Sequence, residues 1–193
     1  SSDIDLSEAH LNYYMYHNKG DKYENTDNDQ TNVIGKYSFT DVGADPRMLQ
    51  LAMSNFGLAS ETSYPISKTT MQGSKEDQNN TQYVMTNSNL LCQQAKGNES
   101  IIKQAILDNG SVLACYYDTS TAYKNSNYYN SNKVNSFNHA ISIVGWDDNY
   151  DANNFDNKPT RNGAWLIKNS WGTGFGNQGY FWMSYDEYSL GSV

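Results

Sequence analysis

The chain has 193 residues, and its 21 acidic side chains outnumber its 13 basic ones, which gives a formal net charge of −8 at pH 7. Such a charge disfavours nucleic acid and anionic membranes as partners, because both require clustered Lys and Arg. No apolar run of about 18 residues occurs, so we expect no membrane span. The two cysteines, Cys92 and Cys115, allow one disulfide at most, so the fold must depend on an apolar core.

The first predicted element is a helix over residues 5–17, with Ser7 placed to cap its N-terminus. His10 and His17 are expected on the polar side of this helix, at the surface or half buried. The opposite face is apolar at helical spacing and contains Leu11, Tyr14 and Met15.

Two further helices carry signals at their ends. Asp45 suits the N-cap of the second, Pro46 its first position and Gly57 the residue that follows it. A third helix is predicted over residues 98–109 and is closed by Gly110. The apolar positions of the second helix are Leu49, Ala52, Met53 and Phe56.

The second half of the chain changes to the pattern of strands, which predicts an α+β protein. Polar segments over residues 119–138 and 147–162 are expected to connect these strands. The strands are predicted over residues 111–117, 139–146, 163–169 and 179–185.

A histidine and an asparagine stand out in this β-rich half. His139 opens an apolar strand, and about thirty residues later Asn169 begins the run Asn-Ser-Trp-Gly, followed by a glycine-rich stretch. These glycines lack a following Lys-Ser/Thr, so they do not form a phosphate-binding loop. The histidines and cysteines lack zinc spacing, and the Asp-rich segment 147–156 lacks the spacing of a calcium loop. We therefore expect no metal and no cofactor.

These two motifs resemble the papain family of cysteine peptidases, in which the histidine lies in an Asn-His-Ala strand and the asparagine in Asn-Ser-Trp-Gly. Further segments follow the family's order: Leu6-Ser7-Glu8, Pro46, Gly57 and Tyr64-Pro65. The resemblance implies a papain-like two-domain fold that is incomplete at its N-terminus. Residues 1–75 would form part of a helical left domain, and residues 76–193 an antiparallel β-barrel right domain.

The resemblance also assigns chemical roles. His139 would be the acid and base that works with a thiolate, and Asn169 would orient its ring without adding charge. Trp171 would shield the His–Asn hydrogen bond from water. Alternatively, Trp171 is a core aromatic side chain with no catalytic part. The implied function is hydrolysis of peptide bonds in a peptide or protein substrate.

The family's nucleophile is absent from the sequence. It belongs to a Gln…Cys-Gly-x-Cys-Trp segment, and no such segment occurs here. Cys92 lies in a divergent polar stretch and Cys115 inside a predicted strand, so neither replaces it. Three explanations stay open: the cysteine lies on a lost N-terminal segment or a second chain, the protein is an inactive homologue that binds peptides or surfaces, or the fold serves another function.

The resemblance further implies a set of substrate-binding residues. Asp45 is assigned to this set and to the helix cap above, and the sequence leaves both roles open. A narrow to medium, fairly polar S2 pocket would favour uncharged or basic P2 side chains. The polar, weakly charged composition favours a secreted or cell-surface protein. The implied substrate-binding residues are Gly43, Ala44, Asp45, Pro46, Cys115 and Asn138.

Overall fold

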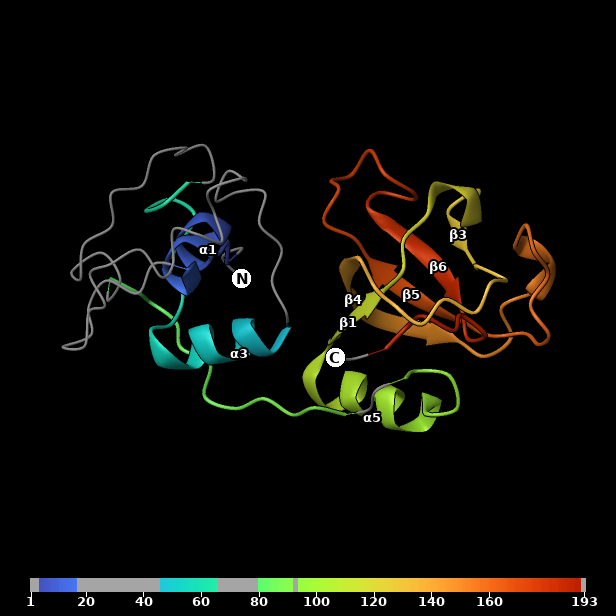
Figure 1. Ribbon diagram of the computed structural model, residues 1–193, viewed down its shortest axis with the longest axis horizontal. Coiled ribbons are helices and arrows are strands. Elements are labelled where there is room, and N and C mark those ends of the chain that lie inside the picture. The colour runs from blue at the N-terminus through green and yellow to red at the C-terminus, as the bar shows by residue number, and fades with distance from the viewer. Residues whose placement is uncertain (1–3, 17–45, 66–79, 92–93, 192–193) are drawn as a thin grey trace. The chain divides into compact units, whose positions relative to one another are not determined.

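The computed structural model describes residues 4–16, 46–65, 80–91 and 94–191 (Figure 1). Its internal contacts divide the chain into two compact units, Ser1–Asn89 and Leu90–Val193. The expected domain boundary between residues 75 and 76 lies outside the described residues. No helix within the described ranges is long and apolar enough to cross a membrane.

The first helix of the N-terminal unit, α1, runs over Glu8–Tyr16 and begins where its cap was predicted. The His10 backbone N–H donates a hydrogen bond to Ser7 Oγ over 2.9 Å, so Ser7 satisfies one of the free donors of the first turn. The Ser7 hydroxyl in turn donates to the Tyr64 carbonyl over 2.5 Å. The cap therefore also fixes the segment around Tyr64 against the start of α1.

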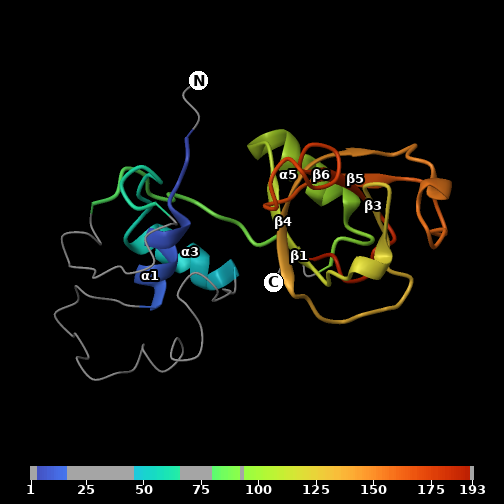
Figure 2. The ribbon, with the colours of Figure 1, turned by 90° about the horizontal axis from the view of Figure 1, so that it is seen from above.

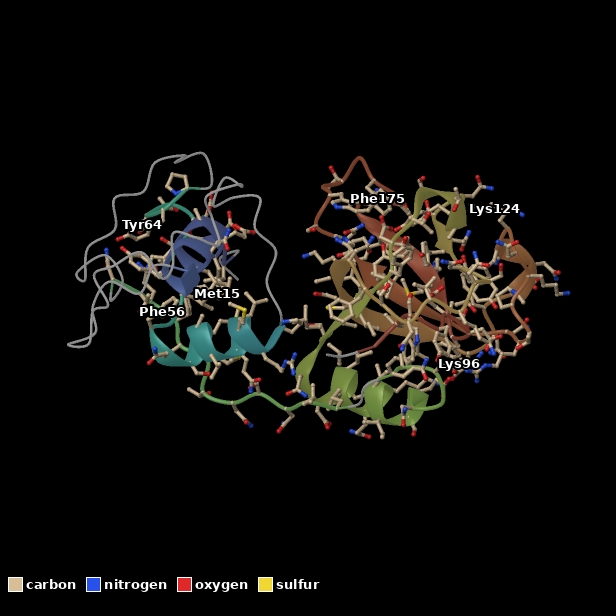
Figure 3. All side chains as sticks on the ribbon, in the orientation of Figure 1. Met15, Phe56, Tyr64, Lys96, Lys124 and Phe175 are labelled. Carbon is tan, nitrogen blue, oxygen red and sulfur yellow. The ribbon has the colours of Figure 1, made fainter. Side chains whose placement is uncertain are left out.

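The expectation that His10 lies on a polar face is wrong, because its side chain is 0% exposed. Its ring centroid lies 4.8 Å from that of Tyr14, 4.9 Å from that of Tyr64 and 6.2 Å from that of Phe56. Tyr64 and Phe56, which come from distant parts of the chain and lie near α1 (Figure 3), surround the His10 ring. His17 lies outside the described residues.

The second described helix, α3, runs over Pro46–Asn55 and confirms Pro46 at the first helical position. Gly57 follows it with φ of +82°, and a Cβ there would lie 2.4 Å from the Tyr83 carbonyl oxygen, so only glycine fits. The predicted cap, Asp45, lies outside the described residues. Side chains from α1, α3 and the segment after α3 form a small apolar core whose buried members are Leu11, Ala52 and Leu58.

The C-terminal unit begins with α5 over Glu99–Asn109, as predicted. Its buried side chains are Ile102, Ala105 and Ile106. Gly110 ends the helix with φ of +86°, and its N–H donates to the Ile106 carbonyl over 2.7 Å.

A six-stranded sheet forms the rest of this unit (Figure 2). Its strand order is β1-β4-β5-β6-β3-β2, and all pairs are antiparallel except the parallel pair β3–β6. No ladder joins the edge strands β1 and β2 within residues 94–191, so the sheet is open. The strands are β1 Val112–Tyr116, β2 Tyr123–Lys124, β3 Asn127–Tyr128, β4 His139–Asp147, β5 Ala164–Lys168 and β6 Tyr180–Ser184.

The four long strands confirm the prediction, whereas β2 and β3 lie in a segment that was predicted to be a connection. Each has two residues, which is too short to show an alternating pattern. Short 3₁₀ helices, Ser120–Ala122 and Ala152–Asn154, lie in the two connections.

The sheet register positions the candidate site. β4 begins at His139 and β5 ends at Lys168, and Ser142 pairs with Lys168 in antiparallel fashion. The first residue of β4 and the residue after β5 therefore lie at the same end of the sheet. At that end Tyr116, the last residue of β1, pairs with His139. Buried side chains such as Trp165, Ile143 and Phe181 belong to the apolar core of this unit.

Candidate active site

His139 and Asn169 are joined by a hydrogen bond. The distance from His139 Nε2 to Asn169 Oδ1 is 2.9 Å. The Ser170 backbone N–H also donates to Asn169 Oδ1, over 2.8 Å, and this donor identifies that atom as the amide oxygen. Since an amide oxygen only accepts, His139 Nε2 carries a proton, and in the neutral ring Nδ1 holds the lone pair.

Trp171 stacks on the His139 ring. Their centroids lie 4.7 Å apart with 27° between the ring planes. The Trp171 side chain is 46% exposed, which is not the burial of a core residue, whereas Asn169 is 7% exposed. Phe175 meets Trp171 edge-on at 4.7 Å. The indole therefore lies between solvent and the His–Asn pair.

A second aromatic side chain, Tyr116, contacts His139. Their ring centroids are 5.7 Å apart and the planes are inclined by 70°. Tyr116 is 0% exposed and was not singled out from the sequence. Only the pairing of β1 with β4 brings it to His139, so no local sequence signal could have indicated this contact.

A cluster of hydroxyl groups lies behind Tyr116. The Tyr116 and Tyr123 hydroxyls each donate to Asp118 Oδ1 over 2.9 Å and lie 2.6 Å from one another. Burial raises the pKa of both tyrosines, and their contact with one another adds to this effect at Tyr116. Both hydroxyls consequently remain protonated donors at neutral pH.

Asn138, predicted as a pocket wall, is tied to Asp118. Its Nδ2 donates to the Asp118 carbonyl over 3.1 Å, and its Oδ1 accepts from the Asp118 N–H over 2.6 Å. The Asn138 backbone N–H also donates to the Tyr116 carbonyl over 3.1 Å. Both ends of the side-chain amide are thus occupied, although the residue is exposed.

Cys115 pairs with Ala140 in the ladder between β1 and β4, and its side chain is 4% exposed. Successive residues of a strand point to opposite faces, so Cys115 points away from the face on which Tyr116 meets His139. Its thiol does not reach the His139 ring from there. Whether it lines a substrate pocket stays a prediction.

The remaining predicted substrate residues belong to the N-terminal unit. Pro46 begins α3, and Gly43, Ala44 and Asp45 lie outside the described residues. The structure brings together His139, Asn169 and Trp171, with Asn138 next to His139 in the chain.

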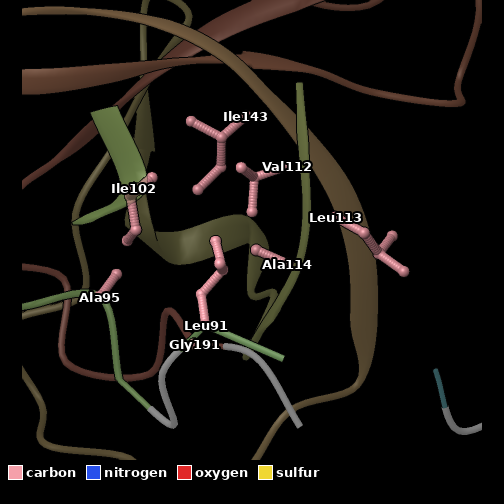
Figure 4. A pocket seen from close by; sticks show the side chains of 8 residues that line it. All are labelled: Leu91, Ala95, Ile102, Val112, Leu113, Ala114, Ile143 and Gly191. Atoms are coloured by element: carbon pink, nitrogen blue, oxygen red, sulfur yellow. The ribbon is translucent and has the colours of Figure 1, made fainter. Parts of the chain in front are cut away.

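Other features of the described residues carry no comparable chemistry. Those residues contain no group of three or more His, Cys, Asp or Glu side chains able to hold a metal ion. A pocket between α5 and β1 is lined only by apolar groups (Figure 4). Its lining residues are Leu91, Ala95, Ile102, Val112, Leu113, Ala114, Ile143 and Gly191.

A histidine held by a neutral amide and covered by an indole, at one end of a sheet, is the arrangement expected for the acid–base half of a thiol-dependent hydrolase site. The comparison with protein families agrees with this class. The model of the papain family cysteine proteases matches residues 27–192, and the chain belongs to this family.

Cathepsins are among its curated relatives. Bovine cathepsin S is 30% identical over 142 residues, which cover 70% of this chain and 38% of that protein. Cysteine proteinase 3 of Entamoeba histolytica is 27% identical over 154 residues, covering 77% of this chain and 44% of that protein. The chain therefore spans less than half the length of these relatives.

Solved structures show the same fold. The clostridial cysteine protease Cwp84 after propeptide cleavage superposes with a TM-score of 0.65 at 30% identity, covering 98% of this chain and 45% of that one. Procathepsin L 3 from the larval midgut of Tenebrio molitor superposes with a TM-score of 0.59 at 18% identity, which supports the fold alone.

Proposed function

We propose that this chain carries the histidine–asparagine half of a cysteine peptidase site that hydrolyses peptide bonds. The observation that supports this proposal best is the 2.9 Å bond from His139 Nε2 to Asn169 Oδ1. It leaves Nδ1 as the ring atom available for proton transfer, and no described residue hydrogen-bonds to that atom. The thiol would come from a segment outside residues 1–193 or from a second chain, because Cys115 points away from this face and Cys92 does not lie in the family's Cys-Trp motif.

The proposed reaction begins with transfer of the thiol proton to His139 Nδ1, which produces a thiolate and an imidazolium. The thiolate attacks the carbonyl carbon of the scissile bond. His139 then gives its proton to the leaving nitrogen, and a thioester and a free amine result. Water attacks the thioester while Nδ1 takes one of its protons, and the thiol is regenerated with release of the carboxylic acid.

Asn169 and Trp171 would support this cycle without exchanging protons. A neutral amide orients the ring without adding the negative charge that a carboxylate supplies in serine triads. The indole face lies against a ring that is cationic during part of the cycle, which is a favourable cation–π arrangement. It also keeps water from one side of the His–Asn bond, which strengthens that bond.

The substrate and location of the parent protein are part of the same proposal. An extended peptide would pair with the backbone near Gly43 and Ala44, and Asp45, Pro46, Cys115 and Asn138 would line its side-chain pockets. We propose export to the cell surface or medium, since Cwp84 is described as a surface-layer-associated protein. Antibody detection in lysate, surface extract and culture medium of the source organism tests this; signal confined to the lysate contradicts it.

The test of activity uses the full-length product of the parent gene and an epoxysuccinyl peptide that alkylates activated thiols. We expect one cysteine to be labelled and a fluorogenic peptide to be cleaved. His139→Ala should abolish both, and Asn177→Ala, an exposed asparagine of the same loop, should preserve both. A parent protein that binds peptides but neither reacts nor cleaves would overturn the proposal and indicate an inactive homologue.

A further inference from the structure

Two groups of aromatic side chains contact the His139 ring, one through Tyr116 and one through Trp171, and both lead to the Asp118 carboxylate. The first group is Tyr116, whose ring lies 5.7 Å from that of His139 and whose hydroxyl donates to Asp118 Oδ1 over 2.9 Å. The second group passes through Trp171, which stacks on His139, and Phe175. Asp118 therefore binds directly to the one member of the first group, Tyr116.

The second group reaches Asp118 through Tyr123. The Phe175 ring lies 5.6 Å from the Tyr123 ring with the planes at 88°, an edge-to-face contact. The Tyr123 hydroxyl donates to the same Asp118 Oδ1 over 2.9 Å. One carboxylate oxygen therefore binds a tyrosine of each group: Tyr116 in the first and Tyr123 in the second.

A carboxylate suits this position for a simple reason of proton count. Three oxygen–oxygen contacts join Tyr116, Tyr123 and Asp118, but the two hydroxyls supply only two protons. When both hydroxyls donate to Asp118 Oδ1, that oxygen accepts two hydrogen bonds and must carry no proton itself. A carboxylate meets this need, and an amide oxygen meets it without the charge.

Asp118 is also fixed to the backbone beside His139. Both polar ends of the Asn138 side chain bind the Asp118 backbone, and Asn138 immediately precedes His139. Contacts therefore run from His139 through Tyr116, Asp118 and Asn138 back to His139. In such a closed set, turning of the His139 ring would disturb its packing against Tyr116, whose hydroxyl is held by Asp118.

We propose that Asp118 is a positioning residue for His139, because its carboxylate anchors Tyr116 and Tyr123 and thereby both groups of aromatic side chains that hold the imidazole. The proposal rests on the proposed function, in which Nδ1 of His139 must face a thiol. Asp118 touches no reacting atom. Its effect is to keep the ring in the orientation in which Nε2 meets Asn169.

Nuclear magnetic resonance of the 193-residue chain tests this without requiring peptidase activity. Ring protons beside aromatic faces resonate away from their positions in free histidine. With only three histidines in the chain, the His139 signals are assigned by comparison with His139→Gln. We expect Asp118→Ala to move them towards free histidine, with the buried His10 signals unchanged. Asp118→Asn, which retains an acceptor, should restore them.

Two tyrosine variants provide a milder perturbation and a matched control. Tyr116→Phe keeps the ring beside His139 but removes its bond to Asp118, so a smaller movement in the same direction is expected. The Tyr150 ring stacks on Trp182, and its hydroxyl donates a hydrogen bond to Asn127. Tyr150→Phe also removes one tyrosine hydrogen bond, but it should leave the His139 signals unchanged. If Asp118→Ala does not fold, the His139 signals of Tyr116→Phe and Asp118→Asn decide whether the proposal holds. Wild-type His139 signals in Tyr116→Phe, or in a folded Asp118→Ala, would overturn the proposal.

Kinetics of the full-length parent enzyme separates positioning from substrate binding. A misaligned proton donor lowers kcat, so Asp118→Ala should lose about tenfold in kcat with little change in KM. Asp118→Asn should recover most of that loss. An unchanged kcat beside displaced His139 signals would contradict positioning for catalysis. A parent enzyme with no activity in the wild type would sink the proposed function, while the resonance result would still decide the role of Asp118.

Discussion

Trp171 lies over His139 with ring centroids 4.7 Å apart and ring planes 27° from parallel. The contact is unusual for its exposure, because 46% of the Trp171 side chain is open to solvent. An exposed indole contributes little to the core, so its replacement separates an effect on the imidazole from an effect on the fold.

Replacing Trp171 by alanine should therefore lower kcat/KM markedly and leave the stability of the fold nearly unchanged. Loss of the ring face removes a cation–π contact and admits water to the His–Asn bond, for an expected decrease of between about 3- and 30-fold. The midpoint of thermal unfolding should change by only a few degrees. Trp171→Phe should recover part of the rate. Equal rates in the alanine and wild-type enzymes would contradict a shielding role.

Asn169→Ala should reduce turnover while leaving substrate affinity nearly unchanged. The change removes the acceptor for His139 Nε2, and within the described residues Asn169 Nδ2 has no partner to lose. We expect kcat to fall by between about 10- and 100-fold through misorientation of the imidazole. Ser170→Ala is the matched control, because Ser170 contributes its backbone N–H and not its hydroxyl to Asn169. A similar loss in both variants would point to general damage to the loop.

Gly176 should be indispensable to the loop that carries Trp171. Its φ is +57°, and an added Cβ would lie 2.3 Å from the Tyr180 carbonyl oxygen. Gly176→Ala should lower the free energy of unfolding by roughly 2–4 kcal/mol, as measured by urea denaturation. Gly174 serves as the control, because a Cβ added there would meet no atom within 4 Å. Gly174→Ala should change stability by less than about 1 kcal/mol.

Asp186 should make the C-terminal unit sensitive to acid. Burial alone would raise its pKa, but hydrogen bonds from Thr160 and the ion pair with Lys96 outweigh this and lower the pKa to about 2. Because this lies below the ordinary value of 3.8, the stabilisation is present at neutral pH. It is lost as the pH falls from about 4 towards 2.

The corresponding measurement compares stability–pH profiles of wild type and Asp186→Asn. The wild type should lose roughly 2 kcal/mol more than the variant between pH 4 and 2. Taking the difference cancels other groups, including the buried Glu187, whose pKa burial shifts upward. Asp156→Asn, at an exposed position, is the control and should follow the wild type. Parallel profiles for wild type and Asp186→Asn would refute the assignment.

Cys115 should be inert towards thiol reagents in the folded chain. Its side chain is 4% exposed within β1, so neither iodoacetamide nor an epoxysuccinyl peptide should modify it under native conditions. Complete alkylation is expected in urea, and mass spectrometry of proteolytic peptides distinguishes Cys115 from Cys92. Selective native reaction of the inhibitor with Cys115 would contradict the orientation described above.

Local signals in the sequence were sufficient for the helices and the long strands. Ser7, Pro46 and Gly110 mark helix ends by the backbone groups they satisfy or free, and such signals need no tertiary information. The burial of His10 could not be predicted in this way, since Tyr64 and Phe56, far along the chain, supply its surroundings.

In the candidate site, too, some features follow from local sequence and others depend on residues that are distant in the chain. His139 and Asn169 were identified because their motifs resemble those of a known family, and their hydrogen bond agrees with that expectation. The contact between Tyr116 and His139 depends on the register of β1 against β4. The contribution of Asp118 depends in turn on the positions of Tyr116 and Tyr123, so it emerges only from the assembled sheet.

The connection between β4 and β5 leaves the sheet at the end opposite His139 and Asn169, where Asp147 pairs with Ala164. Its residues 156–158 are exposed. Foreign sequence inserted there, such as an epitope or a fluorescent reporter, would be separated from the imidazole by the length of strand β4. The fold thus offers a tagging position that is independent of catalysis, and it allows this connection to diverge in length while the His–Asn pair stays fixed.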